Sequence, residues 1–189
     1  GNTYQGAAYV YTLANGTWSQ ASELTASNGA GYDGFGYSVA LSSAGTTALI
    51  GAYKATVNSA AGQGAAYVYT TADNWITSAQ ATELTASDGV AGDNLGISVA
   101  LSSNGTTALV GADGVGFTYG AAYVYTKPGS GWATSATPLA KLTASNGAAS
   151  EYFGWSVALS ATGATALVGA YQKTVGGNTY QGAAYVYTL

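Results

Sequence analysis

Acidic side chains recur at one position of a repeating pattern, where they could bind a cation or the hydroxyl groups of a sugar. Asp33, Asp93 and Glu151 each stand two residues before the Phe or Leu of a recurring Phe-Gly or Leu-Gly pair. The same position suits a structural role, because a carboxylate in a turn accepts hydrogen bonds from nearby backbone N–H groups. The occurrence of one acid per repeat favours the structural interpretation.

Aromatic side chains form a second set of candidates. Trp18, Trp75 and Trp132 follow one another at intervals of 57 residues. Together with Asp113 and Tyr119, which belong to a variable loop, they could form the aromatic shelves of a carbohydrate-binding site. The alternative interpretation is that each indole covers the outer edge of its own sheet.

The residue types that most enzymes use are missing from this chain. It contains no Arg, His, Cys or Met, which excludes thiol nucleophiles, imidazole bases, Cys and His zinc sites and Arg phosphate clamps. Most of the eight acids stand at equivalent turns of different repeats, so no carboxylate pair for glycoside hydrolysis is evident. We therefore predict a protein that is not an enzyme and needs no cofactor.

The low charge of the chain narrows its partners and its location. Charged residues make up 6% of the sequence and the net charge is −4, so a nucleic-acid surface is not expected. Apolar runs of a few residues do not predict membrane insertion. No initiating Met or signal peptide is visible, which fits a processed chain or a fragment of a longer one. The abundance of Tyr and Gly, with few residues that oxidise or carry charge, favours an extracellular or cell-surface location.

Three sequence motifs return in the same order, so the chain is an array of one module. Their positions are GAAYVYT at 6–12, 64–70, 120–126 and 182–188, LTAS at 24–27, 84–87 and 142–145, and SVALS at 38–42, 98–102 and 156–160. A period of about 60 residues made of short strands is typical of propellers and other repeat architectures.

Short apolar alternations within one module predict four antiparallel β-strands. In the clearest copy these are expected at 35–41, 47–52, 64–70 and roughly 79–86. The first two form a hairpin through a tight turn at 43–46, and no segment has helical periodicity.

Both faces of the third strand are apolar or small. Tyr67 and Tyr69 point to one face, and Ala66 and Val68 to the other. A sheet of this kind needs cover on both sides. Radially stacked four-stranded sheets provide that cover, so the predicted fold is an all-β propeller.

The motifs of the clearest copy are FGYSVAL at 35–41, ALIGA at 48–52, GAAYVY at 64–69, Trp75 and LTAS at 84–87. This series resembles the bacterial FG-GAP repeat, and the resemblance extends over essentially the whole chain. It implies a propeller related to the head of integrin α subunits, in which such repeats serve adhesion and sometimes bind calcium.

The resemblance also indicates where a calcium site would lie, which is the turn after the first strand. In calcium-binding members this turn carries several spaced acids, because calcium takes about six to eight oxygen ligands. The corresponding turns at 42–46, 102–106 and 160–164 contain no carboxylate. We therefore predict that the metal site is absent.

The array divides into about three FG-GAP-like modules. We expect a half blade with strands three and four at 1–34, whole blades at 35–94 and 95–152, and a blade with strands one to three at 153–189. A closed propeller needs about four to eight blades, so one chain leaves the ring incomplete. Residues 1–13 are identical to 177–189, which fits either association between chains or a window from a longer array with a period of 176 residues.

The leading hypothesis is a structural or adhesive propeller that associates with itself, as a ring or a filament, by completing blades between chains. Exposed sheet edges and apolar faces would drive this association. The alternatives are a lectin-like propeller that binds surface glycans and a calcium-dependent adhesion head that has lost its usual loops. The tyrosines expected at the contact are Tyr4, Tyr9, Tyr11, Tyr180, Tyr185 and Tyr187.

Overall fold

The fold consists of four antiparallel sheets that follow one another along the chain. The computed structural model describes residues 2–76 and 79–188. The strands of the first two sheets are β1 (Ala8–Ala14), β2 (Thr17–Leu24), β3 (Phe35–Leu41), β4 (Thr47–Ala52), β5 (Ala65–Thr70) and β6 (Ala79–Leu84). Those of the last two are β7 (Ser98–Leu101), β8 (Thr107–Ala112), β9 (Ala121–Thr126), β10 (Ala140–Leu142), β11 (Phe153–Leu159), β12 (Thr165–Ala170) and β13 (Ala183–Thr188).

The strand order within each sheet is that of a propeller blade. The two whole blades have the orders β3-β4-β5-β6 and β7-β8-β9-β10, the first sheet contains β1-β2, and the last contains β11-β12-β13. All neighbouring strands are antiparallel. The predicted all-β propeller with an incomplete ring is therefore confirmed. One short helix, α1 (Val115–Thr118), lies in the variable loop of the second whole blade.

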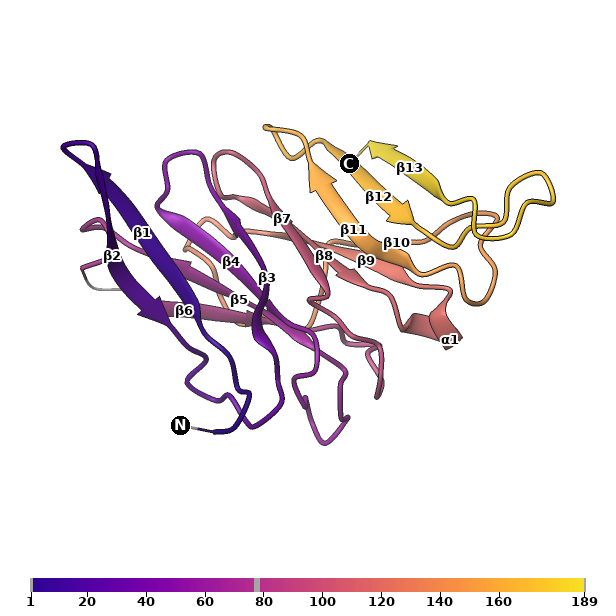
Figure 1. The fold of residues 1–189 in the computed structure, drawn as a ribbon, viewed down its shortest axis with the longest axis horizontal. Coiled ribbons are helices and arrows are strands. Elements are labelled where there is room, and N and C mark those ends of the chain that lie inside the picture. Colours follow the sequence, from indigo (N-terminus) through magenta and orange to yellow (C-terminus); the bar gives the residue numbers. More distant parts are fainter. Residues whose placement is uncertain (1, 77–78, 189) are drawn as a thin grey trace.

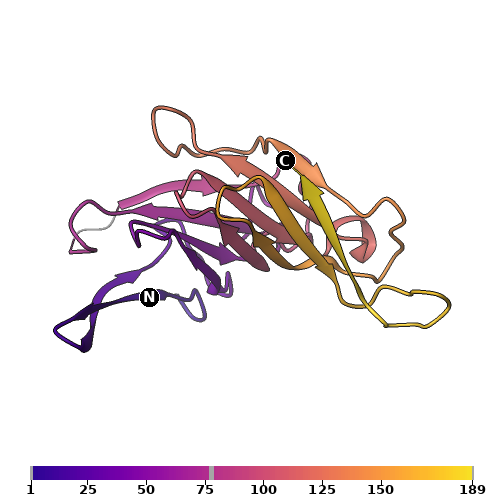
Figure 2. The same cartoon turned by 90° about the horizontal axis from the view of Figure 1, so that it is seen from above.

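The sheets stand side by side, with the indigo half blade at one end and the yellow last blade at the other (Figure 1). The first strands β3, β7 and β11 contact one another in series. Viewed from above, the indigo hairpin and the yellow strand lie at opposite ends of the molecule (Figure 2), and a buried cluster joins each sheet to the next. Each inner sheet therefore has one neighbour on each face.

The two faces of a blade have different partners. In the first whole blade, Ile50, Tyr67 and Tyr69 are buried against the half blade that precedes it. On the opposite face, Leu49 and Val68 are buried against the blade that follows. The pattern confirms that both faces of these strands are covered, and it gives the stack a direction.

Tyrosine hydroxyls fix each blade to the one before it. The second tyrosine of the YVY motif donates a hydrogen bond to a threonine carbonyl in the LTAS motif of the preceding blade. The three bonds join Tyr69 to Thr25 at 2.8 Å, Tyr125 to Thr85 at 2.9 Å and Tyr187 to Thr143 at 2.9 Å. Burial raises the pKa of Tyr69 to about 12.

Glycine allows the second strands to approach the next blade closely. A Cβ atom on Gly111 would lie 2.0 Å from the carbonyl oxygen of Gly154, so no larger residue fits. The same carbonyl accepts a hydrogen bond of 2.7 Å from the hydroxyl of Ser98. Gly51, Gly96 and Ser38 repeat this arrangement one blade earlier.

We predict that Tyr125→Phe lowers the free energy of unfolding by about 1–2 kcal/mol, because the buried carbonyl of Thr85 loses its donor. Tyr119→Phe is the control, since that ring is exposed. Chemical denaturation of both variants measures the difference. Equal stability of the two variants would contradict the role given to the hydroxyl.

Candidate functional site

The repeated acids are buried and accept backbone hydrogen bonds in the turns between blades. The bonds are Ala30 N to Asp33 at 2.6 Å, Val90 N to Asp93 at 2.8 Å and Ala148 N to Glu151 at 2.9 Å. These contacts confirm the structural interpretation of this position. Within residues 2–76 and 79–188, no three Asp, Glu, His or Cys side chains come together as a metal-binding group.

Glu151 differs from the other two acids because it also forms a buried ion pair. Its carboxylate lies 2.9 Å from the ammonium of Lys173, and both side chains are almost fully buried. Burial acts to raise the carboxyl pKa, but the Lys173 and Ala148 hydrogen bonds outweigh it and the pKa is lowered. Burial raises the pKa of Asp93, to which a backbone N–H donates.

The turns where the family's calcium ligands would stand are held by serine hydroxyls and by one another. The hydroxyl of Ser42 accepts the N–H of Thr47 at 3.1 Å. The N–H of Ser43 donates to the carbonyl of Ser103 at 2.9 Å. The N–H of Ser103 donates in the same way to the carbonyl of Ala161, also at 2.9 Å. These turns therefore connect successive blades, and the absence of calcium stays a prediction.

The three repeated tryptophans differ in local structure, because Trp18 lies within β2 whereas Trp75 and Trp132 lie in the connections that precede β6 and β10. Trp75 is 2% exposed, and its indole N–H donates to the carbonyl of Gly45 at 2.7 Å. Trp132 is half-buried and donates to Gly105 at 3.0 Å. Both glycines belong to the turn between strands one and two of the same blade. Trp18 is 65% exposed, because its half blade contains no such turn.

The five lectin candidates are not gathered into one site. The three tryptophans belong to three separate blades, and the buried indole of Trp75 offers no face to a sugar ring. Asp113 is buried and accepts a hydrogen bond from Asn94 at 3.0 Å, and burial raises its pKa. Tyr119 is exposed and lines a groove with Lys141. Glycan binding through these residues stays a prediction.

The tyrosines expected at a contact between chains divide into two groups. Tyr4, Tyr9, Tyr11 and Tyr180 are exposed. Tyr185 and Tyr187 are half-buried inside the chain, where their hydroxyls donate to Asn146 and Thr143 at 2.9 Å. These last two side chains therefore hold the last blade to its own neighbour.

The open face of the last blade carries aliphatic side chains that the sequence reasoning missed. Leu167 and Val186 are 44% and 69% exposed, whereas their counterparts Leu49 and Val68 are fully buried against the next blade. These residue types are the same in every copy of the module. Only their position in the last module could have indicated that they are exposed.

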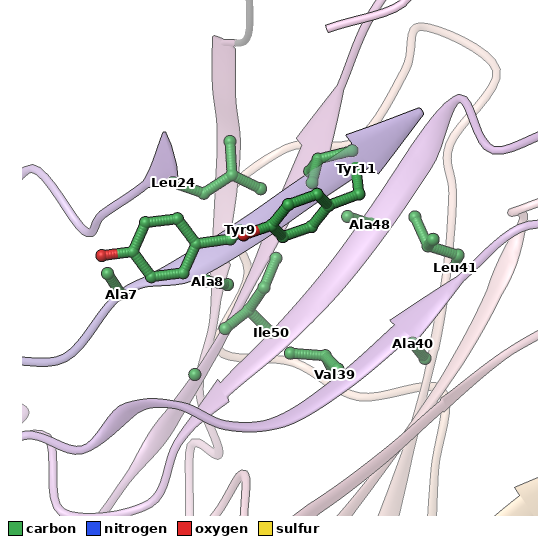
Figure 3. A pocket seen from close by; sticks show the side chains of 12 residues that line it. Ala7, Ala8, Tyr9, Tyr11, Leu24, Val39, Ala40, Leu41, Ala48 and Ile50 are labelled. Atoms are coloured by element: carbon green, nitrogen blue, oxygen red, sulfur yellow. The ribbon is translucent and has the colours of Figure 1, made fainter. Parts of the chain in front are cut away.

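A groove of about 350 Å³ lies at the other end of the stack, beside β1. Its walls come from β1, β2, β3 and β4, and they are mainly aliphatic (Figure 3). Val39 and Leu41 on β3 are 62% and 55% exposed there. The corresponding Val99 and Leu101 pack against the preceding blade. The groove thus occupies the place of strands one and two of the half blade.

A cluster of aromatic rings on the last blade was also missed. The rings of Trp155 and Tyr171 lie 4.8 Å apart, and Tyr152 lies 5.4 Å from Tyr171. Trp155 and Tyr171 are exposed. Trp155 and Tyr171 are 16 residues apart, and the equivalent Tyr37 and Tyr53 have the same spacing and a ring contact of 4.4 Å in the first whole blade, so this repeated spacing was a signal for the pair.

A family model of the FG-GAP repeat matches three segments, residues 18–69, 79–125 and 137–187. Each segment joins the fourth strand of one blade to the first three strands of the next. A comparison with curated proteins gave no match. Among the described residues, no helix has the length and apolar character needed to cross a membrane.

We predict that Lys173→Met lowers the free energy of unfolding at pH 7 by roughly 3–5 kcal/mol, because a buried carboxylate loses its partner. The depressed pKa of Glu151 adds stability above its ordinary pKa of about 4.5, and this is lost as pH falls through the folded value. The difference in free energy of unfolding between the wild type and Lys173→Met should therefore become smaller in acid.

Lys141→Met is the control, since its ion pair with Asp88 is partly exposed and should contribute less than about 1 kcal/mol. Thermal melts of the three proteins from pH 7 to pH 3 make the comparison. A gap between wild type and Lys173→Met that does not change with pH would contradict the assignment.

Proposed function

Because the chain belongs to the FG-GAP repeat family, we propose that it is a non-enzymatic structural or adhesive protein of the cell exterior, whose copies associate end to end through their outer blades. The observation that carries the proposal is the exposure of Leu167 and Val186 on a face that is fully buried in the earlier blades. An apolar face of this kind is typical of an interaction site.

The two ends of the stack complement each other. The last blade exposes the face that, inside the chain, packs against a following blade. The groove beside β1 exposes Val39 and Leu41, whose counterparts pack against a preceding blade. Different surfaces therefore meet in each contact, so association leads to a closed ring or to an open filament.

Composition supports the same function. With 6% charged residues, the surface has little of the charge that keeps small domains monomeric. The low content of residues that oxidise suits a protein exposed outside the cell. The missing Arg, His and Cys support a role without catalysis.

We predict that the 189-residue chain forms species that are multiples of its 18.7 kDa mass, and that Gly169→Ala keeps it at 18.7 kDa. In the free chain a Cβ atom at Gly169 meets mainly the hydroxyl oxygen of Ser156, at 2.4 Å, and this side chain can rotate away. In an assembled stack the same Cβ would meet the backbone of the next blade, as it would at Gly111.

Light scattering after chromatography, followed by electron microscopy, measures the assembly. The matched control is Gly111→Ala, which should lower the melting temperature, whereas Gly169→Ala should leave it nearly unchanged. A wild-type chain that stays monomeric at every accessible concentration would overturn the proposal.

Glycan binding is a second candidate function, and the exposed rings of Trp155 and Tyr171 favour it. Large aromatic faces offer apolar area to a flat ligand. If these rings bind sugars, Trp155→Ala should abolish a signal on a glycan array, and Tyr180→Ala, an exposed ring elsewhere on the loops, should keep it. An array without any signal for the wild type would exclude this function.

A further inference from the structure

We propose that copies join by exchanging one strand, so that β1 of one copy replaces β13 of another at the edge of β12. The completed blade then has the order β11-β12-β1-β2, with two strands from each copy. This inference rests on the self-association proposed above and specifies its mechanism.

β1 repeats the sequence of β13. Residues 1–13 and 177–189 have the same sequence, so β1 is a second copy of β13. The three family matches begin at residue 18 and together contain β2 to β13, which leaves β1 outside them. Among the described residues, the third strands are β1, β5, β9 and β13, and the pairs of first and second strands are β3-β4, β7-β8 and β11-β12.

The free edge of β1 is the place where a second strand belongs. In the whole blades the third strand pairs with strands two and four, as β5 does with β4 and β6. β1 pairs with β2 alone, and its other edge borders the groove shown in Figure 3. An exposed edge of this kind is a template for a strand from another chain.

The incoming strand must be β12 of a second copy, and β13 must leave it. β12 is paired on one edge with β11 and on the other with β13, so β1 can reach it only in place of β13. The new ladder repeats the old one, in which Leu167 stands opposite Val186. Val10 has the position of Val186, so it would face Leu167 of the second copy.

The bonds lost with β13 are restored by identical residues. Tyr185 and Tyr187 now donate to Asn146 and Thr143. After the exchange, Tyr9 and Tyr11 of the first copy donate to the same two acceptors of the second. Tyr9 and Tyr11 are about half exposed in the free chain, and they become buried as Tyr67 and Tyr69 are.

The exchange also makes a contact that the free chain lacks. The hydroxyl of Ser156 in the second copy reaches the carbonyl of Gly36, as Ser98 reaches Gly154.

The groove beside β1 is filled in the same step. The β11-β12 hairpin of the second copy brings Leu167 over Val39 and Leu41, which repeats the packing of Leu49 over Val99 and Leu101. Burial of these exposed side chains contributes about 25 cal/mol per Å² of apolar area. The exchange therefore keeps the hydrogen-bonded ladder along β12 and adds a packed interface between the two copies.

The reverse exchange, in which β13 takes β2 from β1, would build a similar blade but is disfavoured. β1 is joined to β2 by a tight turn with Asn15 and Gly16 both at positive φ, whereas β13 follows a loop of about 12 residues. The segment before β1 is also bound to its own blades. Gln5 accepts from the N–H of Phe35 at 2.9 Å and donates to Ala26 at 3.0 Å.

The counterpart of Gln5 near β13 is Gln181, which accepts a bond from Asn178 within its own loop at 3.1 Å. Tyr180, the counterpart of Tyr4, is 69% exposed, whereas Tyr4 packs on Tyr32 with the ring centroids 5.3 Å apart. The segment just before β13 is therefore held by fewer neighbouring segments than the one before β1, which leaves β13 freer to move away from β12.

The test is a disulfide between copies, which the cysteine-free chain makes simple. Val10→Cys with Leu167→Cys should give a covalent series of oligomers that a reductant dissolves. The two positions lie at opposite ends of the stack, so they cannot link within one chain (Figure 1). Val10→Cys with Val90→Cys is the control and should stay uncrosslinked beyond background.

Two outcomes separate this mechanism from self-association in general. In the first outcome, oligomers form and a disulfide joins Ser22→Cys to Val186→Cys, but none joins positions 10 and 167. This result would overturn the direction of exchange and leave self-association standing. Oligomers that form with neither link would overturn strand exchange itself. Monomers throughout would overturn both proposals.

A matched pair of proline variants provides a second measurement. Tyr11→Pro and Tyr187→Pro place the same change in identical local sequences, at a position that pairs with the second strand of a blade, and proline removes the ladder donor there. Tyr187→Pro should loosen β13 and lower the concentration at which half of the chains assemble. Tyr11→Pro should abolish assembly. The opposite ranking would overturn the proposal.

Discussion

The close packing of one blade face on the next is the interaction on which the whole structure depends. With 6% charged residues and no cysteine, the chain must be stabilised mainly by apolar burial and hydrogen bonds. The two faces of a blade have different chemistry. One presents tyrosines, and the other presents aliphatic side chains and a glycine that admits the neighbouring backbone. This difference gives the stack two unlike ends, each with the surface that the other end would bury.

The recurring motifs of the sequence are explained by this interface. The LTAS motif supplies the threonine carbonyl to which a tyrosine of the next blade donates. The SVALS motif supplies the serine hydroxyl that reaches the next glycine carbonyl. The sequence repeats because this contact repeats, and each FG-GAP match contains both partners of one tyrosine-to-threonine bond between blades. The repeat of the sequence is therefore offset from the blade as a structural unit.

Much of the fold could be predicted because its signals are local. Alternating apolar residues and tight turns placed β3, β4 and β5 within a residue of their observed bounds, and the fourth strand ends at Leu84, two residues earlier than expected. The candidate site was less accessible, because it depends on which copy of a motif has a neighbour. Val68 and Val186 have equivalent positions, yet one is buried and the other exposed. Only the arrangement of blades distinguishes Leu167 from Leu49.

Identity between the donated and the displaced strand has a thermodynamic consequence. Because β1 and β13 have one sequence, exchanging them leaves the free energy of the β12 ladder nearly unchanged. The equilibrium is then decided by what is new in the assembly, which is the bond of Ser156 and the filled groove, set against the entropy lost on association. Val186 is already exposed before β13 is released, so exposing this side chain adds little to the free-energy cost of the exchange. Assembly can thus be tuned by surface contacts without changing the stability of the blades that carry them.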